Sequence, residues 1–343
     1  MNKLQYKFSG KTTTYYFDAK FAYLEKLVNK LQAVILTDEH VFQAHQKKFK
    51  GWNTIVIQAG EAYKVQATVD SVIGQLIAMG ADRKTFLVGI GGGVVTDIAG
   101  YVAAVYMRGI PCGFLPTSIL AMVDASIGGK NGIDVGLYKN LVGTIRQPAF
   151  LLYDYSLLKT LPEGEWVNGF AEIIKHAAIK DATLFRELEK NKLTTYRRDK
   201  AALAKLIRRN VVIKSNVVEK DEFEQGDRRM LNFGHTLGHA IENIYELPHG
   251  HAISIGMVAA SLISEEYTDF KDTDRVTGTL KKYGLPTQIA FDGKEVMNVL
   301  KMDKKRVKDS MNYVLLSKIG QAVVKVIPIV QLEKLLQSIL TAR

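Results

Sequence analysis

A short apolar run that ends in a cluster of glycines is the strongest constraint in this sequence. Residues 85–93 read TFLVGIGGG, and VVTDIAGYVAAVY follows at once with helical periodicity. Glycines at such a junction let the backbone approach a phosphate closely, and the amino end of the following helix offers free N–H groups. The dinucleotide fingerprint is incomplete, because Thr96 stands where its third glycine would be. The turn fits a pyrophosphate site, and equally a tight strand-to-helix connection.

The first half of the chain alternates short β-rich runs with helical stretches. Strands are predicted over residues 31–38, 54–60, 85–93 and 112–118, and helices over 64–79 and 94–106. This alternation predicts a parallel sheet with both faces covered by helices. VDASIGGKNGID (123–134) is read as an anion-binding loop rather than a helix.

The second half is predicted to be mainly α-helical. Helical segments cover residues 165–179, 200–221, 232–245 and 252–267, and strand signals return only at 312–320 and 322–329. We therefore divide the chain at Leu161–Pro162 into an α/β domain (1–161) and a mainly helical domain (162–343). A ligand cleft between the two is the expected place for chemistry.

Composition narrows the class of protein. The 343 residues are 47% hydrophobic and 24% charged, which excludes a disordered chain. A single cysteine, Cys112, rules out an intramolecular disulfide and a cysteine-rich zinc site. We find no secretory signal and no span long enough for a bilayer, so we expect a cytoplasmic protein that does not bind membranes.

The net charge of +11 comes from 46 Lys and Arg against 35 Asp and Glu. These basic residues are dispersed rather than gathered in a stripe with aromatic residues between them. The pattern favours an enzyme for an anionic small molecule over a nucleic-acid-binding protein.

Four of the seven histidines fall within residues 235–251: His235, His239, His249 and His251. This density favours a metal or acid–base role. His235 and His239 share one helical face, whereas His249 and His251 cannot face the same point if their segment is helical.

A third metal ligand has to come from elsewhere in the chain. Glu172 is a candidate, because a carboxylate within an apolar helix is costly unless it is paired. Taken by itself, Glu172 is better explained by a helical ion pair with Lys175, one turn later. Three nitrogen or oxygen ligands with one open position would make a catalytic zinc site.

Several segments resemble the 3-dehydroquinate synthase family of sugar-phosphate cyclases. They are GEAYK (60–64), GGGVVTDIAGYVAAVYMRG (91–109), PTSILAMVDASIGGK (116–130), KNLVG (139–143), LKTLP (158–162), GFAEIIKHAAI (169–179), EQGDRRMLNFGHTLGHAIE (224–242), HGHAISIGM (249–257) and DKK (303–305). The resemblance implies an NAD-binding α/β domain followed by a helical metal-binding domain. It places a zinc or cobalt ion on Glu172, His235 and His249, and makes His239 a substrate-side residue.

The same resemblance implies two further sets of residues. NAD contacts fall on Asp38, Glu61, Lys64, Gly92, Gly93, Asp97, Thr117, Ser118, Lys130, Lys139 and Thr160. Substrate contacts and catalytic roles fall on Arg108, Asp124, Lys130, Asn140, Lys175, Lys214, Arg228, Asn232, His239, Lys304 and Lys305. Ser118 replaces a frequent Thr, Met122 a frequent Gln, and His251 stands where many members have Glu.

The family's reaction converts 3-deoxy-D-arabino-heptulosonate 7-phosphate into 3-dehydroquinate and phosphate, in the shikimate pathway to aromatic amino acids. The resemblance implies transient oxidation by NAD, phosphate elimination, re-reduction and an intramolecular aldol closure, with His239 handling a proton. The alternatives are another sugar-phosphate cyclase, or an NAD- and metal-dependent polyol dehydrogenase. We further expect a homodimer.

Overall fold

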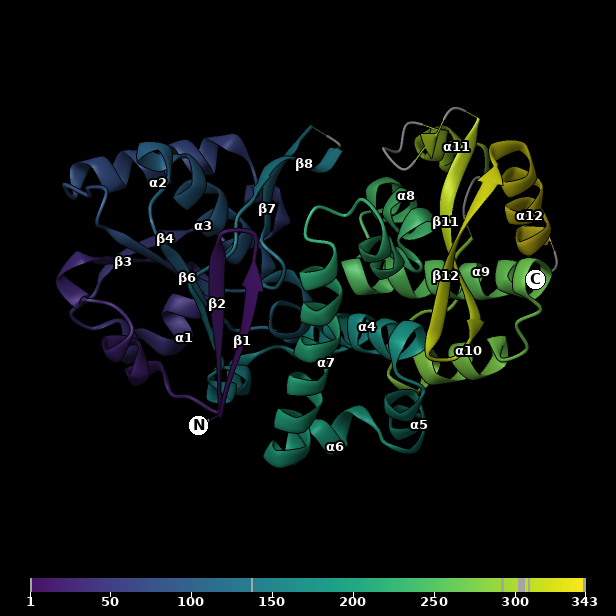
Figure 1. Ribbon diagram of the computed structural model, residues 1–343, viewed down its shortest axis with the longest axis horizontal. Coiled ribbons are helices and arrows are strands. Elements are labelled where there is room, and N and C mark those ends of the chain that lie inside the picture. Colours follow the sequence, from purple (N-terminus) through teal and green to yellow (C-terminus); the bar gives the residue numbers. More distant parts are fainter. Residues whose placement is uncertain (1, 137, 291–292, 302–305, 308, 342–343) are drawn as a thin grey trace. The chain divides into compact units, whose positions relative to one another are not determined.

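The computed structural model describes residues 2–136, 138–290, 293–301, 306–307 and 309–341. They form two compact units (Figure 1). Unit 1 comprises Met1–Trp166 and Lys200–Phe223, and unit 2 comprises Val167–Asp199 and Glu224–Arg343. The division at Leu161–Pro162 stays a prediction, but the compact units differ from it in two respects. The first unit continues to Trp166. Residues 200–223, which were predicted to belong to the second domain, also pack with the first unit.

Unit 1 is built on a seven-stranded sheet of order β1-β2-β9-β6-β5-β3-β4. All neighbouring strands pair in parallel except β1 with β2, which form an antiparallel hairpin at one edge. The strands are β1 (Asn2–Phe8), β2 (Lys11–Phe17), β3 (Ala33–Asp38), β4 (Asn53–Ile57), β5 (Phe86–Gly91), β6 (Cys112–Pro116) and β9 (Phe150–Leu152). Every residue of β3 is buried, as expected for a central parallel strand that is covered on both faces.

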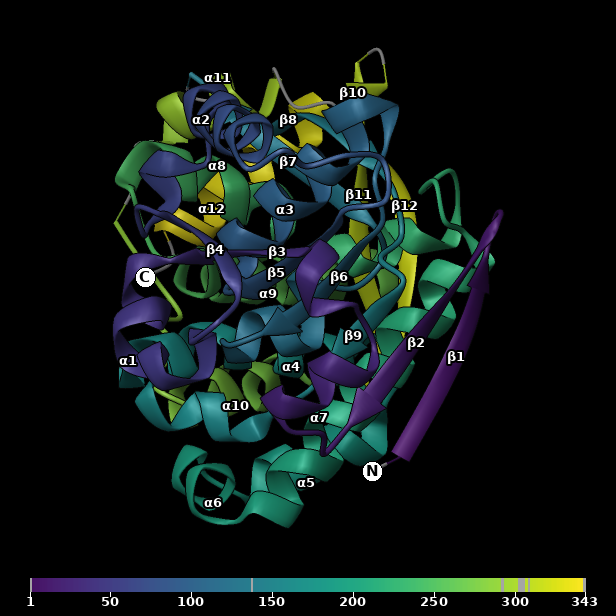
Figure 2. The ribbon, with the colours of Figure 1, turned by 90° about the vertical axis from the view of Figure 1, so that its left-hand side faces the viewer.

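Four helices complete unit 1: α1 (Glu39–Phe49), α2 (Gln66–Ala78), α3 (Gly93–Val105) and α7 (Lys200–Lys220). Helices α2 and α3 lie on one face of the sheet and α1 lies on the other (Figure 2). Short helical turns cover Phe21–Lys26, Lys30–Gln32, Glu61–Tyr63, Tyr106–Arg108 and Tyr155–Thr160, and a π-helical turn (η5) covers Ala121–Ala125. The core beneath α1 includes Ile35, Val88, Leu115 and Leu152, each fully buried.

A second hairpin, separate from the main sheet, consists of β7 (Lys130–Val135) and β8 (Tyr138–Ile145). The prediction of a loop over 123–134 is therefore wrong at both ends, where a π-helical turn and a strand are found. The β1–β2 hairpin was missed as well. The other strands were predicted because they alternate with helices. The two strands of each hairpin follow one another directly, so this pattern could not reveal them.

Unit 2 is mainly helical. Its helices are α4 (Glu163–Lys180, from Val167 onward), α5 (Ala182–Lys190), α6 (Leu193–Arg198), α8 (His235–Tyr245), α9 (His249–Thr268), α10 (Thr273–Lys282), α11 (Gly293–Lys301) and α12 (Ile329–Thr341), with a 3-10 turn (η7) over Asp227–Asn232. A small antiparallel sheet contains β10 (Arg306–Val307), β11 (Ser310–Lys318) and β12 (Gln321–Pro328).

The predicted fold class is confirmed: a mainly parallel sheet with helices, followed by a mainly helical part. Among the described residues, none of the helices combines the length and the apolar character needed to cross a bilayer.

Candidate metal centre and coenzyme site

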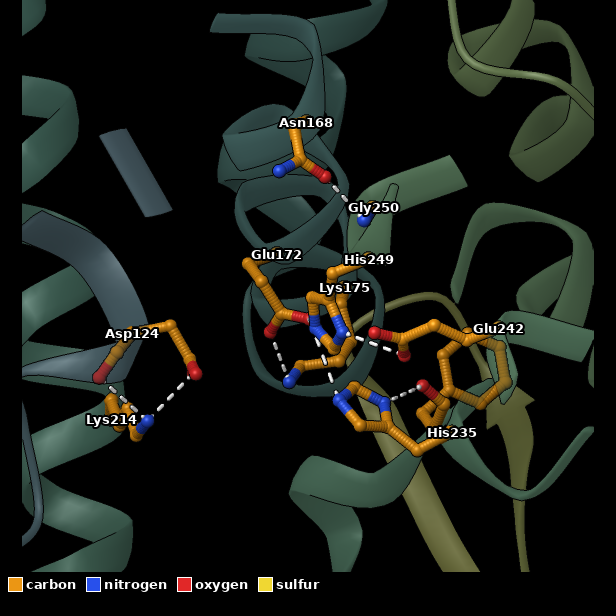
Figure 3. A network of polar contacts seen from close by, with 10 residues as sticks. Asp124, Asn168, Glu172, Lys175, Lys214, His235, Glu242, His249 and Gly250 are labelled. Atoms are coloured by element: carbon orange, nitrogen blue, oxygen red, sulfur yellow. Dashed lines mark hydrogen bonds and ion pairs between the residues drawn. The ribbon is translucent and has the colours of Figure 1, made fainter. Parts of the chain in front are cut away.

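Three side chains from separate helices of unit 2 converge on one point (Figure 3). Glu172 lies on α4, His235 begins α8 and His249 begins α9. The Oε1 atom of Glu172 lies 3.5 Å from Nε2 of His235 and 3.4 Å from Nε2 of His249. The carboxylate is fully buried, whereas the His249 side chain is 26% exposed. The cluster therefore has a buried acidic end and an accessible imidazole edge.

Close backbone contact between α4 and α9 brings Glu172 and His249 together. A Cβ atom at Gly250 would lie 2.1 Å from the carbonyl oxygen of Asn168, so only glycine permits this approach. The Asn168 side chain also accepts a hydrogen bond from the Gly250 N–H at 2.5 Å, in the first turn of α9. Because Asn168 precedes Glu172 by one helical turn, this contact sets Glu172 opposite His249.

Each of the two imidazoles is oriented through its other nitrogen. Nδ1 of His235 donates to the carbonyl oxygen of Phe233 at 3.1 Å, and Nδ1 of His249 donates to Oε2 of Glu242 at 3.2 Å. Both Nε2 atoms thus point at Glu172. An oxygen acceptor behind a metal-binding imidazole fixes its tautomer and its orientation. Glu242 is not among the residues predicted from the sequence, although its place two turns after His235 in an apolar helix was a usable signal.

Charge is concentrated around the buried carboxylate. The Lys175 ammonium, itself buried, forms an ion pair with Oε2 of Glu172. Burial alone would lower the pKa of His249. Hydrogen bonds to Glu172 and Glu242, with the negative charges of both, outweigh it and raise the pKa to about 10. In the metal-free chain His249 is therefore protonated at neutral pH, and a metal ion on its Nε2 would displace a proton.

The spacing of the donor atoms suits a divalent ion. Ligands about 2.0–2.1 Å from a tetrahedral zinc ion lie about 3.4 Å from one another. The distances of 3.5 and 3.4 Å from Glu172 to the two imidazoles match that edge length. His239, Glu242 and His249 form a second group with candidate ligand atoms close together, and the rings of His235 and His239 lie 5.1 Å apart.

In unit 1, the glycine turn lies at the point where the sheet reverses its strand order. Strand β3 leads to β4 on one side, and β5 leads to β6 on the other, so the crevice between the carboxyl ends of β3 and β5 is a topological switch point. Asp38 ends β3, and Gly92 is the N-cap of α3. The Thr117 N–H donates to the Gly91 carbonyl at 2.9 Å, which brings the loop after β6 to the same turn. Switch points of this kind are where nucleotides bind in open α/β sheets.

Asp38 is also the N-cap of α1, since its side chain accepts a hydrogen bond from the Val41 N–H at 2.9 Å. In a similar way, the Ser118 hydroxyl accepts from the Ala121 N–H at 3.2 Å. The Oγ1 atom of Thr160 lies 3.0 Å from Nε2 of His45.

The buried ammonium of Lys64 contacts three other predicted residues of unit 1. Nζ of Lys64 lies 2.6 Å from Asp97 and 3.9 Å from Glu61, and it donates to Oδ1 of Asn140 at 2.6 Å. We call these four residues the Lys64 network. Burial alone would lower the pKa of Lys64, but the charges of Asp97 and Glu61 raise it above its usual range. Burial raises the pKa of the Asp97 carboxyl, while the Lys64 ammonium opposes that shift.

Lys214 on α7 forms an ion pair with Asp124 of η5 at 2.8 Å, and it donates to the Asp124 carbonyl oxygen at the same distance. Two sets of predicted residues are thus in contact within unit 1: the Lys64 network, and Lys214 with Asp124. The remaining predicted contacts in this unit are Arg108, on a left-handed backbone (φ 61°), Lys130, which begins β7, and Lys139, in β8.

In unit 2, Arg228 is buried in η7, and the Asn232 side chain at the end of the same turn donates to Glu224 at 2.5 Å. Lys304 and Lys305 lie outside the described residues. The ligand, coenzyme and substrate roles of all these residues stay predictions.

Two sequence models of protein families match the chain in succession. The model described as 3-dehydroquinate synthase N-terminal covers residues 54–168, and the model described as 3-dehydroquinate synthase C-terminal covers residues 169–306. The chain belongs to the 3-dehydroquinate synthase family. The resemblance drawn from its motifs is therefore confirmed.

Individual members of the 3-dehydroquinate synthase family align over most of the chain. The 3-dehydroquinate synthase of Pyrococcus abyssi is 41% identical over 276 residues, which are 80% of this chain and 81% of that protein. The 3-dehydroquinate synthase of Acetivibrio thermocellus is 40% identical over 87% of this chain and 86% of its own.

A solved structure extends the likeness beyond the 3-dehydroquinate synthases. The 2-epi-5-epi-valiolone synthase ValA of Streptomyces hygroscopicus, with NAD+ and Zn2+ bound, is 28% identical and has a TM-score of 0.88. The alignment covers 98% of each chain.

Proposed function

We propose that this protein is a 3-dehydroquinate synthase, a lyase that converts 3-deoxy-D-arabino-heptulosonate 7-phosphate into 3-dehydroquinate and inorganic phosphate. Membership of the family and the two named relatives support this activity. The observation that carries it is the convergence of Glu172, His235 and His249 on one point, beside an accessible imidazole edge.

Glu172, His235 and His249 would hold a zinc or cobalt ion. Their donor spacing fits a tetrahedral ion, and the Nδ1 bonds to Phe233 and Glu242 leave each Nε2 directed inward. A divalent ion, when bound, supplies charge stabilisation for a substrate oxygen, which is worth several kcal/mol. ValA was solved with Zn2+ bound, which supports the same class of ion here.

Unit 1 would hold NAD at the switch point between β3 and β5. The predicted contacts Asp38, Gly92, Gly93, Thr117 and Ser118 lie at or beside the ends of β3, β5 and β6. NAD, when bound, supplies reversible hydride transfer, so it would be neither consumed nor released as NADH. The Lys64 network would contact the coenzyme through its buried ammonium and the accessible side of Glu61.

The substrate carries a phosphate and a carboxylate, and the chain offers cations for both. Lys130, Lys214, Arg228 and Arg108 would bind and orient these anions, with the guanidinium groups giving bidentate contacts. Asn140 and Asn232 would contact substrate hydroxyls. Much of the rate acceleration would then come from positioning.

Two further side chains of unit 2, Lys175 and His239, would assist the reaction. The ammonium of Lys175 forms an ion pair with Oε2 of Glu172 and so compensates the charge of that buried carboxylate. An imidazole nitrogen of His239, whose ring lies 5.1 Å from that of His235, would hold and return a proton during the reaction. Asp124 would position Lys214 through their 2.8 Å ion pair.

We also propose that the protein is a cytoplasmic homodimer. Sedimentation of the purified protein would test whether it is a dimer.

One assay tests the function. The purified protein is supplied with the heptulosonate phosphate, a divalent metal and a trace of NAD, and both phosphate and NADH are followed. The reaction is redox-neutral overall, so we expect stoichiometric phosphate and 3-dehydroquinate without net NADH. Continuous NADH production from a polyol would instead identify a dehydrogenase.

A second candidate is another sugar-phosphate cyclase, because ValA shares 28% identity across almost the whole chain. A heptulose phosphate that lacks the carboxylate is the discriminating substrate. Preferred turnover of that compound over the heptulosonate phosphate would replace our assignment by this one.

A further inference from the structure

Asp134 lies at an irregularity in the β7–β8 hairpin. Ile133 pairs with Val142 and Val135 pairs with Tyr138, so Asp134 alone stands opposite three residues of β8, 139–141. The bulge puts Asn140 in the left-handed region, at φ 53°. Asparagine tolerates that conformation better than most residues, but the regular ladder no longer provides a partner for its backbone.

Three residues close a ring of hydrogen bonds at this bulge. The Asn140 N–H donates to Oδ1 of Asp134 at 2.7 Å, and the Asp134 N–H donates to the Lys64 carbonyl oxygen at 2.8 Å. Nζ of Lys64 then donates to Oδ1 of Asn140 at 2.6 Å. Asp134 thus holds the backbones of both residues whose side chains meet in the Lys64 network.

We propose that Asp134 is a positioning residue that fixes the left-handed backbone of Asn140 and so aims the Asn140 side chain at the substrate. The inference rests on the proposed function, in which Asn140 contacts substrate and Lys64 contacts NAD. Asp134 acts through its acceptor oxygen, so the ring couples the substrate-binding amide to the coenzyme-binding ammonium. Its negative charge is not required for this role.

The closest competing explanation is electrostatic, because the Asp134 carboxylate also lies near Lys64 and Glu61. Two variants separate the two explanations. Asp134→Asn keeps an acceptor oxygen at the same place and removes the charge, whereas Asp134→Ala removes both.

Kinetics with the metal-loaded enzyme and NAD provide the first measurement. We expect Asp134→Ala to raise KM for the heptulosonate phosphate about tenfold, as for a lost hydrogen bond at a binding group, with kcat within about threefold of wild type. Asp134→Asn should restore KM to within about threefold. Equal impairment of both variants would overturn the proposal in favour of a charge effect, and an unchanged Asp134→Ala enzyme would overturn it outright.

A double-mutant cycle with Asn140→Ala tests the route of the effect. If Asp134 acts through the Asn140 side chain, adding Asp134→Ala to Asn140→Ala should change KM by less than about twofold. A further tenfold loss would overturn the proposal.

Amide hydrogen exchange of the free protein keeps this test independent of the catalytic assignment. Asp134→Ala should speed exchange of the Asn140 amide at least about tenfold, and Asp134→Asn should not. Should wild type fail to release phosphate, the proposed function fails while this measurement still decides the hydrogen-bond role. Unchanged protection of that amide in a folded Asp134→Ala protein would overturn it.

Discussion

The Lys64 network of unit 1 and the metal cluster of unit 2 (Glu172, Lys175, His235, His249 and Glu242) balance buried charge in opposite ways. In the first, a buried cation is surrounded by two carboxylates and an amide oxygen. In the second, a fully buried carboxylate faces an ammonium and two imidazoles. The first arrangement is complete with protein groups alone. The second requires a protonated His249 when no metal ion is present, so its chemistry depends on what occupies it.

This contrast predicts unequal sensitivity to substitution. Losing any one of the three candidate donors, Glu172, His235 or His249, should remove both the ion and the reaction, because each donor is needed for the coordination geometry. Losing one contact in unit 1 should weaken binding and leave the chemical step largely intact. The following variants test that ranking.

The largest effect is expected for Glu172→Gln. The amide keeps the shape of the side chain but removes the negative charge that both imidazoles and Lys175 face. We expect kcat to fall by about 1,000-fold or more, equivalent to several kcal/mol of lost charge stabilisation. Metal content by mass spectrometry should fall below about a tenth of wild type, and full occupancy would contradict the ligand assignment.

His235→Ala should likewise abolish activity together with most of the bound zinc. His251→Ala is the matched control, since His251 lies two positions after His249 on α9 and outside the Glu172, His235 and His249 group. We expect that control to retain zinc stoichiometrically. The ligand assignment is wrong if His235→Ala keeps full turnover.

Glu242→Gln should have an intermediate effect. It weakens the acceptor behind Nδ1 of His249, so the imidazole is less firmly oriented. Losses of this kind cost about 10–100-fold in metal affinity. Competition against a chelator would measure that affinity, and an unchanged value would show that Glu242 does not position His249.

Lys64→Met tests unit 1 in the same way. It removes the ammonium that binds Asp97 and Asn140 while preserving most of the buried volume. We expect KM for NAD to rise about tenfold with little change in zinc content. Loss of zinc along with NAD affinity would erase the distinction between the two sites.

The smallest effect is expected for Lys130→Ala. The side chain begins β7 and is exposed, so its contribution to anion binding is screened by water. A rise of about fivefold in KM for the phosphorylated substrate would fit a single point-charge contact. Unchanged kinetics would remove Lys130 from the substrate site.

Much of this arrangement could be predicted from the sequence, because local patterns carry it. The alternation of strand and helix located β3 to β6, and the spacing of glycines marked the junction where β5 meets α3. The density of histidines and a carboxylate in an apolar helix pointed to the residues that converge in unit 2. Family motifs then selected His249 rather than His251.

Other features depend on contacts between distant residues, and local sequence patterns alone do not specify such contacts. The β7–β8 hairpin lies in a glycine-rich, polar segment that resembles a loop, and its bulge exists only through pairing. Glu242 becomes visible as a partner of His249 only when α8 and α9 pack together. The packing of α7 with unit 1 likewise follows from burial of its face against η5 and β1.

The placement of α7 bears on how this protein could be dissected. The chain passes from one unit to the other at three points, after residues 166, 199 and 223. A gene truncated after residue 166 would encode the whole seven-stranded sheet but not Lys214, and would leave Asp124 without its 2.8 Å ion pair. Neither unit is therefore a continuous cassette, and a split or transplanted version would need α7 reconnected by a new linker.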